Sequence, residues 1–254
     1  MRILALIPGS IAEQLLFLPT LIDLRRSQPT ATINVVVEPR AKAAYTLYRD
    51  VAQVIPFDFP NRNSPSDWAN LLGLIRDQYY DAVISAQPSW SIGLLLWLTG
   101  TPVRVSYAGG SAIFFTRTVT RSQSAYLADR YHTLVEAFGS KSTLPTPELN
   151  LDKSSLDWAK TVQTEQGLTE GYVLIYGGKV WAETTEVYPV DAWSKIFDDF
   201  QQRQPELPRV WLSDGKDQAW IDQLTRSGVT FQVVKPDSLG QVAAIVAGAN
   251  LLIC

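Results

Sequence analysis

Glu13 is the first residue whose type and position could do chemistry. It lies near the start of the apolar helical stretch PGSIAEQLLFLPTL, directly after the apolar segment 2–7. This layout predicts a strand, a tight turn and a helix, with the acid where the strand ends. Open α/β sheets place their ligand sites at that edge. Ser10 and Glu13 also match the S-x-x-E capping box, in which the carboxylate only closes the start of its helix. The residues alone leave both roles open.

A second group of polar residues follows two strands predicted in the later part of the chain. Gly177, Gly178 and Lys179 come directly after one of them. Glycines allow backbone amides to approach phosphate oxygens, and a lysine adds positive charge. The same pair of glycines is equally typical of a simple turn. Asp214 and Asp217 follow the next strand, where a carboxylate can bind ribose hydroxyls. A solvated acidic loop is the favoured interpretation of both residues.

The elements that would position these residues alternate between strands and helices. Short apolar strands are predicted at 4–7, 33–37, 54–57 and 82–85, with helices at 11–27, 40–48, 66–78, 90–99 and about 122–138. After a linker at 140–155, rich in proline and small polar residues, strands are predicted at 172–176, 209–212, 231–234 and 251–253, with helices at 154–167, 190–203, 215–226 and 238–248. This rhythm predicts two doubly wound α/β domains, 1–150 and 151–254, with a ligand cleft between them.

Composition excludes several classes of function. The 254 residues are 46% hydrophobic and 19% charged, and 22 Lys and Arg against 25 Asp and Glu give a net charge of -3. This balance lacks the basic stripe that nucleic-acid binding needs. Cys254 is the single cysteine, which excludes an internal disulfide and fits a reducing, cytoplasmic location. The longest apolar run, 92–98, is far below the roughly 20 residues of a membrane-spanning helix, so at most peripheral membrane contact is expected.

Several segments resemble, in order and spacing, the family 9 glycosyltransferases, the heptosyltransferase-like enzymes of lipopolysaccharide synthesis. They are MRILALIPGSIAEQLLFLPTLIDLRR, INVVVEPRAKAAY, VAQVIPFD, YDAVISAQPSW and TGTPVRVSYAG, followed by PELNL, YVLIYGGK and YPVDAW. The resemblance covers the whole chain and is closest to cyanobacterial members. It implies a GT-B type fold of two Rossmann-like domains. It also implies inverting transfer of a sugar, without metal or cofactor, from a nucleotide diphosphosugar such as ADP-heptose to a lipopolysaccharide or other glycan or glycolipid acceptor.

The resemblance also implies a role for Glu13. The family carries an acidic residue after its first strand, usually Asp, which serves as the general base. Glu13 falls at that position, with Ala12 where the family has glycine. The carboxylate would accept the proton of the acceptor hydroxyl as it attacks the anomeric carbon.

The remaining candidates divide between the two substrates. The expected donor-binding residues are Gly177, Gly178, Lys179 and Asp217, and the expected acceptor-binding residues are Ser10, Arg62, Gln87, Arg117 and Arg121. The arginines could meet an anionic acceptor, although an ordinary surface charge is the favoured interpretation of each one. Glu186 would repel a diphosphate, so either Lys179 compensates for its charge or the donor is held differently. His132, the sole histidine, lies among helical apolar positions and is interpreted as structural or surface-exposed, and no metal site is predicted.

The sequence stops inside the last predicted strand, 251–253. In the doubly wound order 3-2-1-4-5-6, the loop after strand 4 forms one wall of the crevice, and the family carries its acidic donor motif there. We therefore expect a chain cut short at its donor pocket, which binds a nucleotide sugar weakly. Its uncovered edge strand can pair with another chain, which would give self-association.

The sequence leaves two further classes of function to consider. In the first, the chain is a two-lobed binding or interaction protein without turnover, and Glu13 only caps its helix. The second, a nucleotide-dependent oxidoreductase, is poorly supported because neither glycine-containing turn has the G-x-G-x-x-G pattern.

Overall fold

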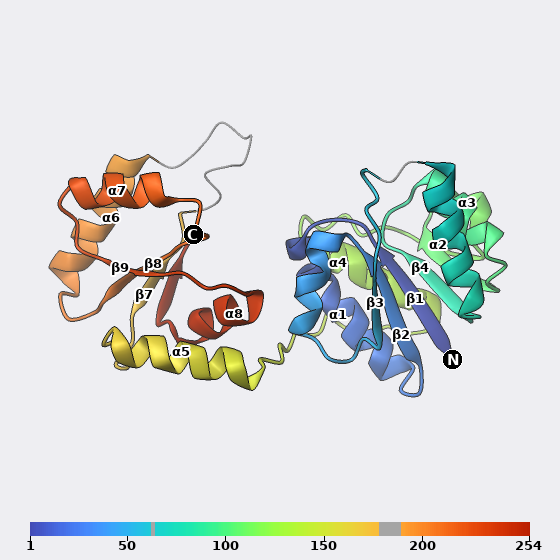
Figure 1. Cartoon of the computed structure of the whole chain (residues 1–254). Coiled ribbons are helices and arrows are strands. Elements are labelled where there is room, and N and C mark those ends of the chain that lie inside the picture. The colour runs from blue at the N-terminus through green and yellow to red at the C-terminus, as the bar shows by residue number, and fades with distance from the viewer. Residues whose placement is uncertain (62–63, 178–188) are drawn as a thin grey trace. The chain divides into compact units, whose positions relative to one another are not determined.

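A computed structural model of the chain describes residues 1–61, 64–177 and 189–254. The chain forms two compact units, Met1–Asn150 and Leu151–Cys254, and each is built around its own parallel sheet (Figure 1). None of the described helices combines the length and the apolar character that a membrane crossing requires.

The sheet of the first unit has six strands in the order β3-β2-β1-β4-β5-β6, and every pairing is parallel. This is the doubly wound order that the sequence predicts. The strands are β1 (Arg2–Ile7), β2 (Thr32–Val37), β3 (Gln53–Pro56), β4 (Ala82–Ser85), β5 (Val103–Tyr107) and β6 (Arg117–Val119). The central strands are buried on both faces, which is why they read as continuous apolar, β-branched runs.

Helical segments cover both faces of this sheet. They are α1 (Ile11–Ser27), η1 (Pro39–Thr46), α2 (Pro65–Asp77), α3 (Trp90–Leu98), η2 (Ala112–Phe114), α4 (Leu127–His132) and η3 (Thr133–Phe138), where η marks a 3₁₀ helix. Alternate residues of β1 point to opposite faces. Ile3, Ala5 and Ile7 pack with α1, η1, α4 and η3, whereas Leu4 and Leu6 pack with α2 and α3 (Figure 1). The helix predicted at 40–48 is a 3₁₀ helix, and the one predicted at 122–138 begins only at residue 127.

The sheet of the second unit has four parallel strands in the order β10-β7-β8-β9. The strands are β7 (Val173–Ile175), β8 (Arg209–Leu212), β9 (Gln232–Val234) and β10 (Leu251–Ile253). The helices α5 (Lys153–Glu165) and α8 (Leu239–Gly248) cover one face, and α6 (Val190–Arg203) and α7 (Gln218–Arg226) cover the other. Strand β10 pairs with β7, as the doubly wound order predicts, and lies at the edge of the described sheet with Leu251 and Leu252 exposed.

Candidate functional site

The turn between β1 and α1 holds Glu13 in a capping box. The Ser10 amide donates to Glu13 Oε2 at 2.6 Å, and the Glu13 amide donates to Ser10 Oγ at 3.5 Å. Gly9 makes this turn possible. Its φ of +127° is strained for any residue with a side chain, and a Cβ there would overlap the Glu13 carboxylate. The carboxylate is therefore folded back at the carboxyl end of β1. Among the described residues, none donates a hydrogen bond to its other oxygen, Oε1.

A buried amide directly behind Glu13 fixes the same turn. Gln14 Nε2 donates to the Ile7 carbonyl at 2.8 Å, and the Tyr45 hydroxyl donates to Gln14 Oε1 at 2.9 Å. Burial raises the pKa of Tyr45, so its hydroxyl keeps the proton that it donates. These two bonds tie α1 to the end of β1 and to η1. Sequence reasoning missed Gln14. The signal that could have found it is a glutamine within an otherwise apolar helical stretch, because such an amide is buried and needs hydrogen-bond partners.

Arg121 and Tyr131 lie at the same end of the sheet as Glu13. Burial and then the negative charge of Glu13 raise the pKa of Tyr131, whereas the charge of Arg121 lowers it. Both charges therefore act on one phenol. The Arg121 guanidinium also lies over the ring of Tyr107, with its carbon 5.5 Å from the ring centroid. Tyr131 was not among the sequence-predicted residues, and it belongs to this group through its place on α4.

The other predicted acceptor residues do not all join this group. Gln87 follows β4 at the same carboxyl edge and is exposed. Arg117 is the first residue of β6, an edge strand separated from β1 by β4 and β5, and it donates to the Ala137 carbonyl at 2.7 Å. In the strand register it lies level with Val105, Ile84 and Ala5, two residues before the end of β1, and its contact with the acceptor stays a prediction. Arg62 lies outside the described residues.

A pair of acids after β2 and β3 was also missed. Burial, and then the charge of Asp58, raise the pKa of Glu38, while the Phe59 backbone and Arg40 lower it. Each acid follows a predicted strand, and their strands are neighbours, so their proximity could have been inferred from the strand order. Within the described ranges, no group of three or more His, Cys, Asp or Glu side chains is placed to hold a metal ion.

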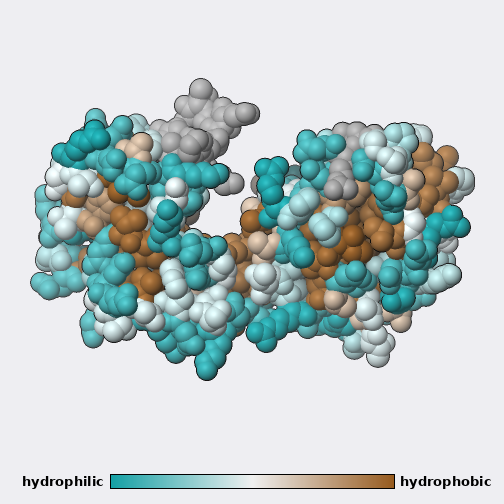
Figure 2. Space-filling model, in the orientation of Figure 1, coloured by the Kyte–Doolittle hydropathy of each residue, from teal (hydrophilic) through white to brown (hydrophobic). Residues whose placement is uncertain are grey.

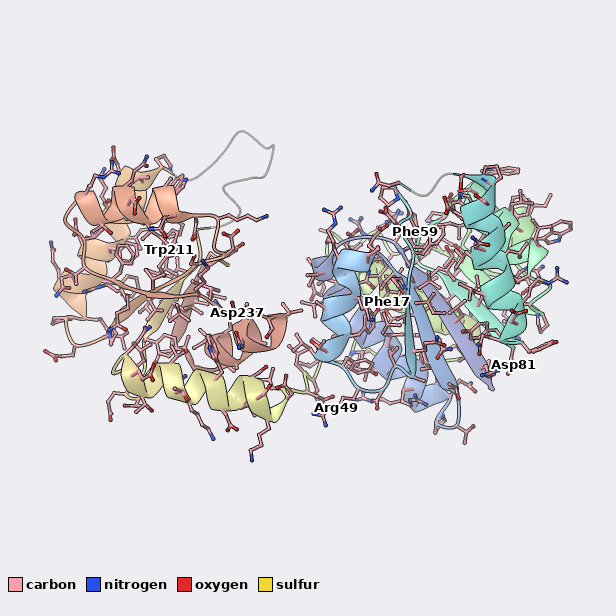
Figure 3. The ribbon with its side chains drawn as sticks, viewed as in Figure 1. Phe17, Arg49, Phe59, Asp81, Trp211 and Asp237 are labelled. Carbon is pink, nitrogen blue, oxygen red and sulfur yellow. The ribbon has the colours of Figure 1, made fainter. Side chains whose placement is uncertain are left out.

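In the second unit, Gly177 has a packing role. It follows β7, and a Cβ at this position would overlap the outer ring of Trp211. The side chain of Trp211, a residue of β8, packs on the face of the sheet that α6 and α7 cover (Figure 3). There its ring contacts those of Trp193 and Phe197. Gly178 and Lys179, the other predicted phosphate-binding residues, lie outside the described residues, and so does Glu186.

Asp217 is part of the core of the second unit. Its Oδ2 accepts from Trp211 Nε1 at 2.6 Å, its Oδ1 accepts from Ser213 Oγ at 2.5 Å, and only 5% of the residue is exposed. The interpretation as a solvated loop acid is therefore wrong for this residue. Binding of ribose hydroxyls by Asp217 would require this internal cluster to open. Asp214 is exposed and accepts from the Lys216 amide at 2.9 Å.

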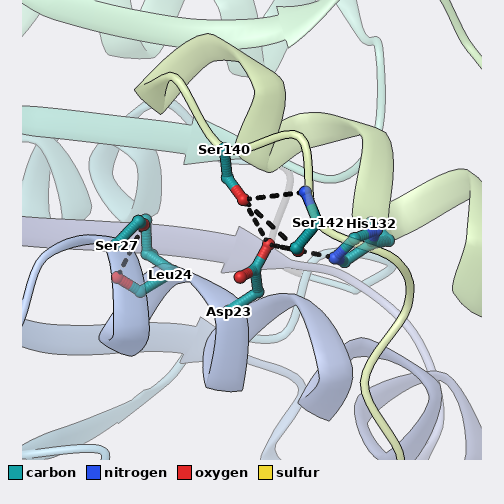
Figure 4. Close-up of polar contacts among 6 residues, drawn as sticks. All are labelled: Asp23, Leu24, Ser27, His132, Ser140 and Ser142. Carbon is teal, nitrogen blue, oxygen red and sulfur yellow. Dashed lines mark hydrogen bonds and ion pairs between the residues drawn. The ribbon is translucent and has the colours of Figure 1, made fainter.

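The sole histidine belongs to a polar cluster around the buried Asp23 of α1 (Figure 4). His132 Nε2 lies 3.1 Å from Asp23 Oδ2, and the same oxygen accepts from Ser140 Oγ at 2.8 Å and Ser142 Oγ at 2.5 Å. Burial alone would raise the pKa of Asp23. The hydrogen bonds from Ser142 and Ser140 and the charge of His132 outweigh burial and lower it. His132 is thus structural, in agreement with one of its predicted roles, and Asp23 joins both His132 and residues 140–142 to α1.

Similar proteins are known at the levels of sequence and fold. Residues 68–254 match the family described as glycosyltransferase family 9 (heptosyltransferase). Over 128 residues the chain is 27% identical to "Photosynthetic NDH subunit of subcomplex B 1, chloroplastic" of Arabidopsis thaliana. The matched region covers 47% of this chain and 28% of that protein. The chain thus spans less than a third of the length of this curated relative.

Three solved structures resemble the chain over 99% of its length. A glycosyl transferase family 9 protein from Veillonella parvula has a TM-score of 0.84 at 18% identity, with 74% of that chain covered. The ADP-heptose lps heptosyltransferase II of E. coli has a TM-score of 0.76 at 15% identity, with 78% covered. The E. coli heptosyltransferase WaaC with ADP-2-deoxy-2-fluoro heptose has a TM-score of 0.73 at 18% identity, with 82% covered. These likenesses confirm the predicted α/β fold of GT-B type.

Proposed function

The chain belongs to glycosyltransferase family 9, and on this premise we propose that it transfers a heptose-like sugar from a nucleotide diphosphosugar to a glycan or glycolipid hydroxyl. One observation carries the proposal: the Glu13 carboxylate is held at the carboxyl end of β1, where open α/β sheets bind ligands, with Oε1 free of hydrogen bonds among the described residues. Two solved relatives are named as complexes of a heptosyltransferase with ADP and with an ADP-heptose analogue, which supports the class of donor.

In the proposed reaction, the acceptor hydroxyl attacks the anomeric carbon as the bond to the diphosphate breaks. The proton of the hydroxyl goes to Glu13 Oε1, and the nucleoside diphosphate leaves with the bonding electrons. The configuration inverts because the hydroxyl attacks on the face opposite the diphosphate in a single displacement. Glu13 suits this step because the Ser10 amide fixes Oε2 and leaves Oε1 as the acceptor of the proton. Ser10, Gln87 and Arg121, at the same edge, are the proposed acceptor-binding residues together with Arg62 and Arg117. Arg117 already donates to the Ala137 carbonyl, so it is the weaker candidate of the two arginines after β5.

The donor side of the proposal rests on the second unit. Gly177, Gly178 and Lys179 are the proposed donor-binding residues, with Lys179 supplying positive charge to the leaving diphosphate. Gly177 also packs against Trp211, so a change at this residue affects the fold before it affects a ligand. Asp217 is the weakest member of the set because both of its oxygens already accept hydrogen bonds inside the unit.

A non-catalytic interaction protein is the second candidate. It is favoured because the acids that the enzyme would use, Glu13 and Asp217, both take part in internal hydrogen bonds. The curated relative is named as a subunit of a photosynthetic NDH subcomplex, which is an assembly role rather than a transferase. In this case Glu13 serves only to cap α1.

Two substitutions in the same capping box separate the candidates. Glu13→Gln keeps a side chain that can cap but cannot accept the proton, whereas Ser10→Ala removes a cap and leaves the carboxylate. For a transferase, release of ADP from ADP-heptose with a heptose-free lipopolysaccharide acceptor should fall by about 10²–10⁴-fold in Glu13→Gln at an unchanged Tm. Ser10→Ala should lose about 1 kcal/mol of stability and much less activity than Glu13→Gln, because it removes a cap and one acceptor contact but keeps the base. Full activity in Glu13→Gln would exclude Glu13 as the general base. An inactive wild-type protein would favour the interaction protein.

A further inference from the structure

Two tryptophans lie at opposite ends of α3 in the first unit, and both reach the surface. Trp90, the first residue of the helix, is 62% exposed, and Trp97, near its end, is 52% exposed. Hydrophobic side chains gather on the surface over this helix (Figure 2). Only Trp90 lies at the carboxyl edge of the sheet, because α3 begins soon after the end of β4 and leads back toward the amino edge, where β5 starts.

The carboxyl edge of this sheet contains the switch point of the doubly wound order. Helix α1 covers one face of the sheet and α3 covers the other, and they follow the neighbouring strands β1 and β4. Ligands of such sheets bind outside the carboxyl ends of the strands, at the point where the strand order reverses. Glu13, in the first turn of α1, and Trp90, at the start of α3, therefore flank the position where this fold binds ligands.

The indole of Trp90 is held in place by residues that follow β5. The ring of Phe114 meets it edge-on, with centroids 5.0 Å apart and planes at 86°. Phe114 is itself packed against α3, because a Cβ at Gly93 would overlap its ring. Gly110 approaches the other part of the indole, since a Cβ there would lie 3.8 Å from Trp90 Nε1. The indole is thus a positioned, rigid surface that loses little conformational entropy when a ligand binds.

Unpaired polar groups accompany the indole at this edge. Neither Trp90 Nε1 nor the exposed side chain of Gln87 forms a hydrogen bond with a described residue. A Cβ at Gly109 meets no atom within 4 Å, so the loop after β5 leaves open space. Ser111, in the same loop, is 4% exposed, and no described residue pairs with its hydroxyl. Buried polar groups normally have a partner, so this hydroxyl points to one from outside the chain.

We propose that Trp90 stacks against a pyranose ring of the acceptor, an inference that rests on the proposed transfer of a sugar. The C–H bonds on one face of a pyranose carry partial positive charge and the face of an indole is negative, so the two attract each other beyond the burial of apolar area. Hydroxyls at the rim of the same ring pair with Gln87 and with Trp90 Nε1. An apolar partner, such as a lipid surface or the ridge of a helix, would cover these polar groups without a bond.

The test measures binding of a deacylated, heptose-free lipopolysaccharide oligosaccharide to the intact protein by calorimetry. The comparison ligand is the same oligosaccharide after periodate cleavage and borohydride reduction, which opens rings and keeps hydroxyls. Only the untreated oligosaccharide should bind. Trp90→Ala should weaken its binding about tenfold, and Trp90→Phe should weaken it less because phenylalanine keeps an aromatic face. The matched control is Trp97→Ala, which removes a similarly exposed tryptophan from the other end of α3 and should leave the affinity unchanged.

Turnover separates this inference from the proposed function. With the same acceptor and ADP-heptose, Trp90→Ala should raise the KM for the acceptor and leave the KM for the donor unchanged, whereas Glu13→Gln should lower kcat. A wild type that binds the oligosaccharide through Trp90 but transfers no sugar would refute the transferase and support the stacking contact.

Four results would overturn the stacking contact. They are a wild type that does not bind the oligosaccharide, equal binding of the ring-opened form, unchanged binding in Trp90→Ala, and an equal loss in Trp97→Ala, which would assign the effect to the whole apolar surface of α3. Circular dichroism of each variant verifies that the fold is retained.

Discussion

Replacement of Gly9 by alanine tests how the turn before α1 holds Glu13. The new Cβ would overlap the Glu13 carboxylate and would force a side-chain-bearing residue to a φ of +127°. Backbone strain of this kind costs about 1–3 kcal/mol. Displacement of the carboxylate from the Ser10 amide removes one half of the capping box, which costs about 1 kcal/mol. The free energy of unfolding of the first unit should therefore fall by about 2–4 kcal/mol.

The two contributions can be separated by a double-mutant cycle. Glu13→Ala alone should cost about 1 kcal/mol, because it removes the cap. In the Gly9→Ala background the cap is already lost, so the same substitution should cost nothing beyond the additivity error of about 0.5 kcal/mol. Gly73→Ala is the matched control. A Cβ at Gly73 meets no atom within 4 Å, and alanine inside α2 should stabilise the helix by about 0.5–1 kcal/mol.

Urea unfolding and hydrogen exchange of the α1 amides measure these changes. Exchange is the sharper readout, since the two units can unfold separately and a single midpoint would mix them. The reasoning fails if Gly9→Ala costs less than about 1 kcal/mol, which is below the lowest sum of strain and capping. It fails equally if Glu13→Ala costs the same in both backgrounds, because the carboxylate then does not depend on the space that Gly9 leaves.

Two other perturbations test the buried polar groups. The pKa of Asp23 lies below its usual value of 3.8 in the folded chain, so its contribution to stability is complete above that value and is lost as the pH falls through the lowered pKa. In Asp23→Asn, the free energy of unfolding should consequently fall less steeply below pH ~4 than in the wild type. Urea unfolding midpoints measured against pH test this, and the same decrease below pH ~4 in both proteins would refute it. Trp211→Phe removes the indole donor to the buried Asp217 and should lower the free energy of unfolding by about 1.5–3 kcal/mol, measured by hydrogen exchange of the β8 amides. The control is Trp220→Phe, at a partly buried tryptophan, which should lower it by less; equal losses would contradict a specific role for the bond to Asp217.

The central strands could be predicted from the sequence because their signal is local. Strands such as β2 are buried on both faces and rich in valine and isoleucine. Strands β5 and β6 were both missed. Strand β5 includes Arg104 and Ser106 within an otherwise apolar run, and β6 has only three residues, two of them exposed. The helix predicted from residue 122 starts later because Ser122 Oγ and Ser124 Oγ accept the amides of Ser124 and Tyr126. Those bonds give the backbone a turn in place of the helix.

The candidate site could be predicted only where its interacting residues lie close together in the sequence. The capping box is a spacing of three residues and could be read directly from Ser10 and Glu13. The cluster around Asp23 joins residues 109 or more positions apart, which leave no local pattern. Asp217 lies in the polar segment SDGKDQ and resembles a solvated acid by composition. It is buried because β8 supplies the indole of Trp211 and the hydroxyl of Ser213 as donors.

The contact between Gly177 and Trp211 links two positions that are far apart in the sequence. The indole occupies the space that a side chain at position 177 would need. A lineage that acquires alanine or serine at 177 can retain this packing only with a smaller ring at 211, and that ring would then also give up the bond to Asp217. Substitutions at positions 177, 211 and 217 should accordingly be correlated among related sequences.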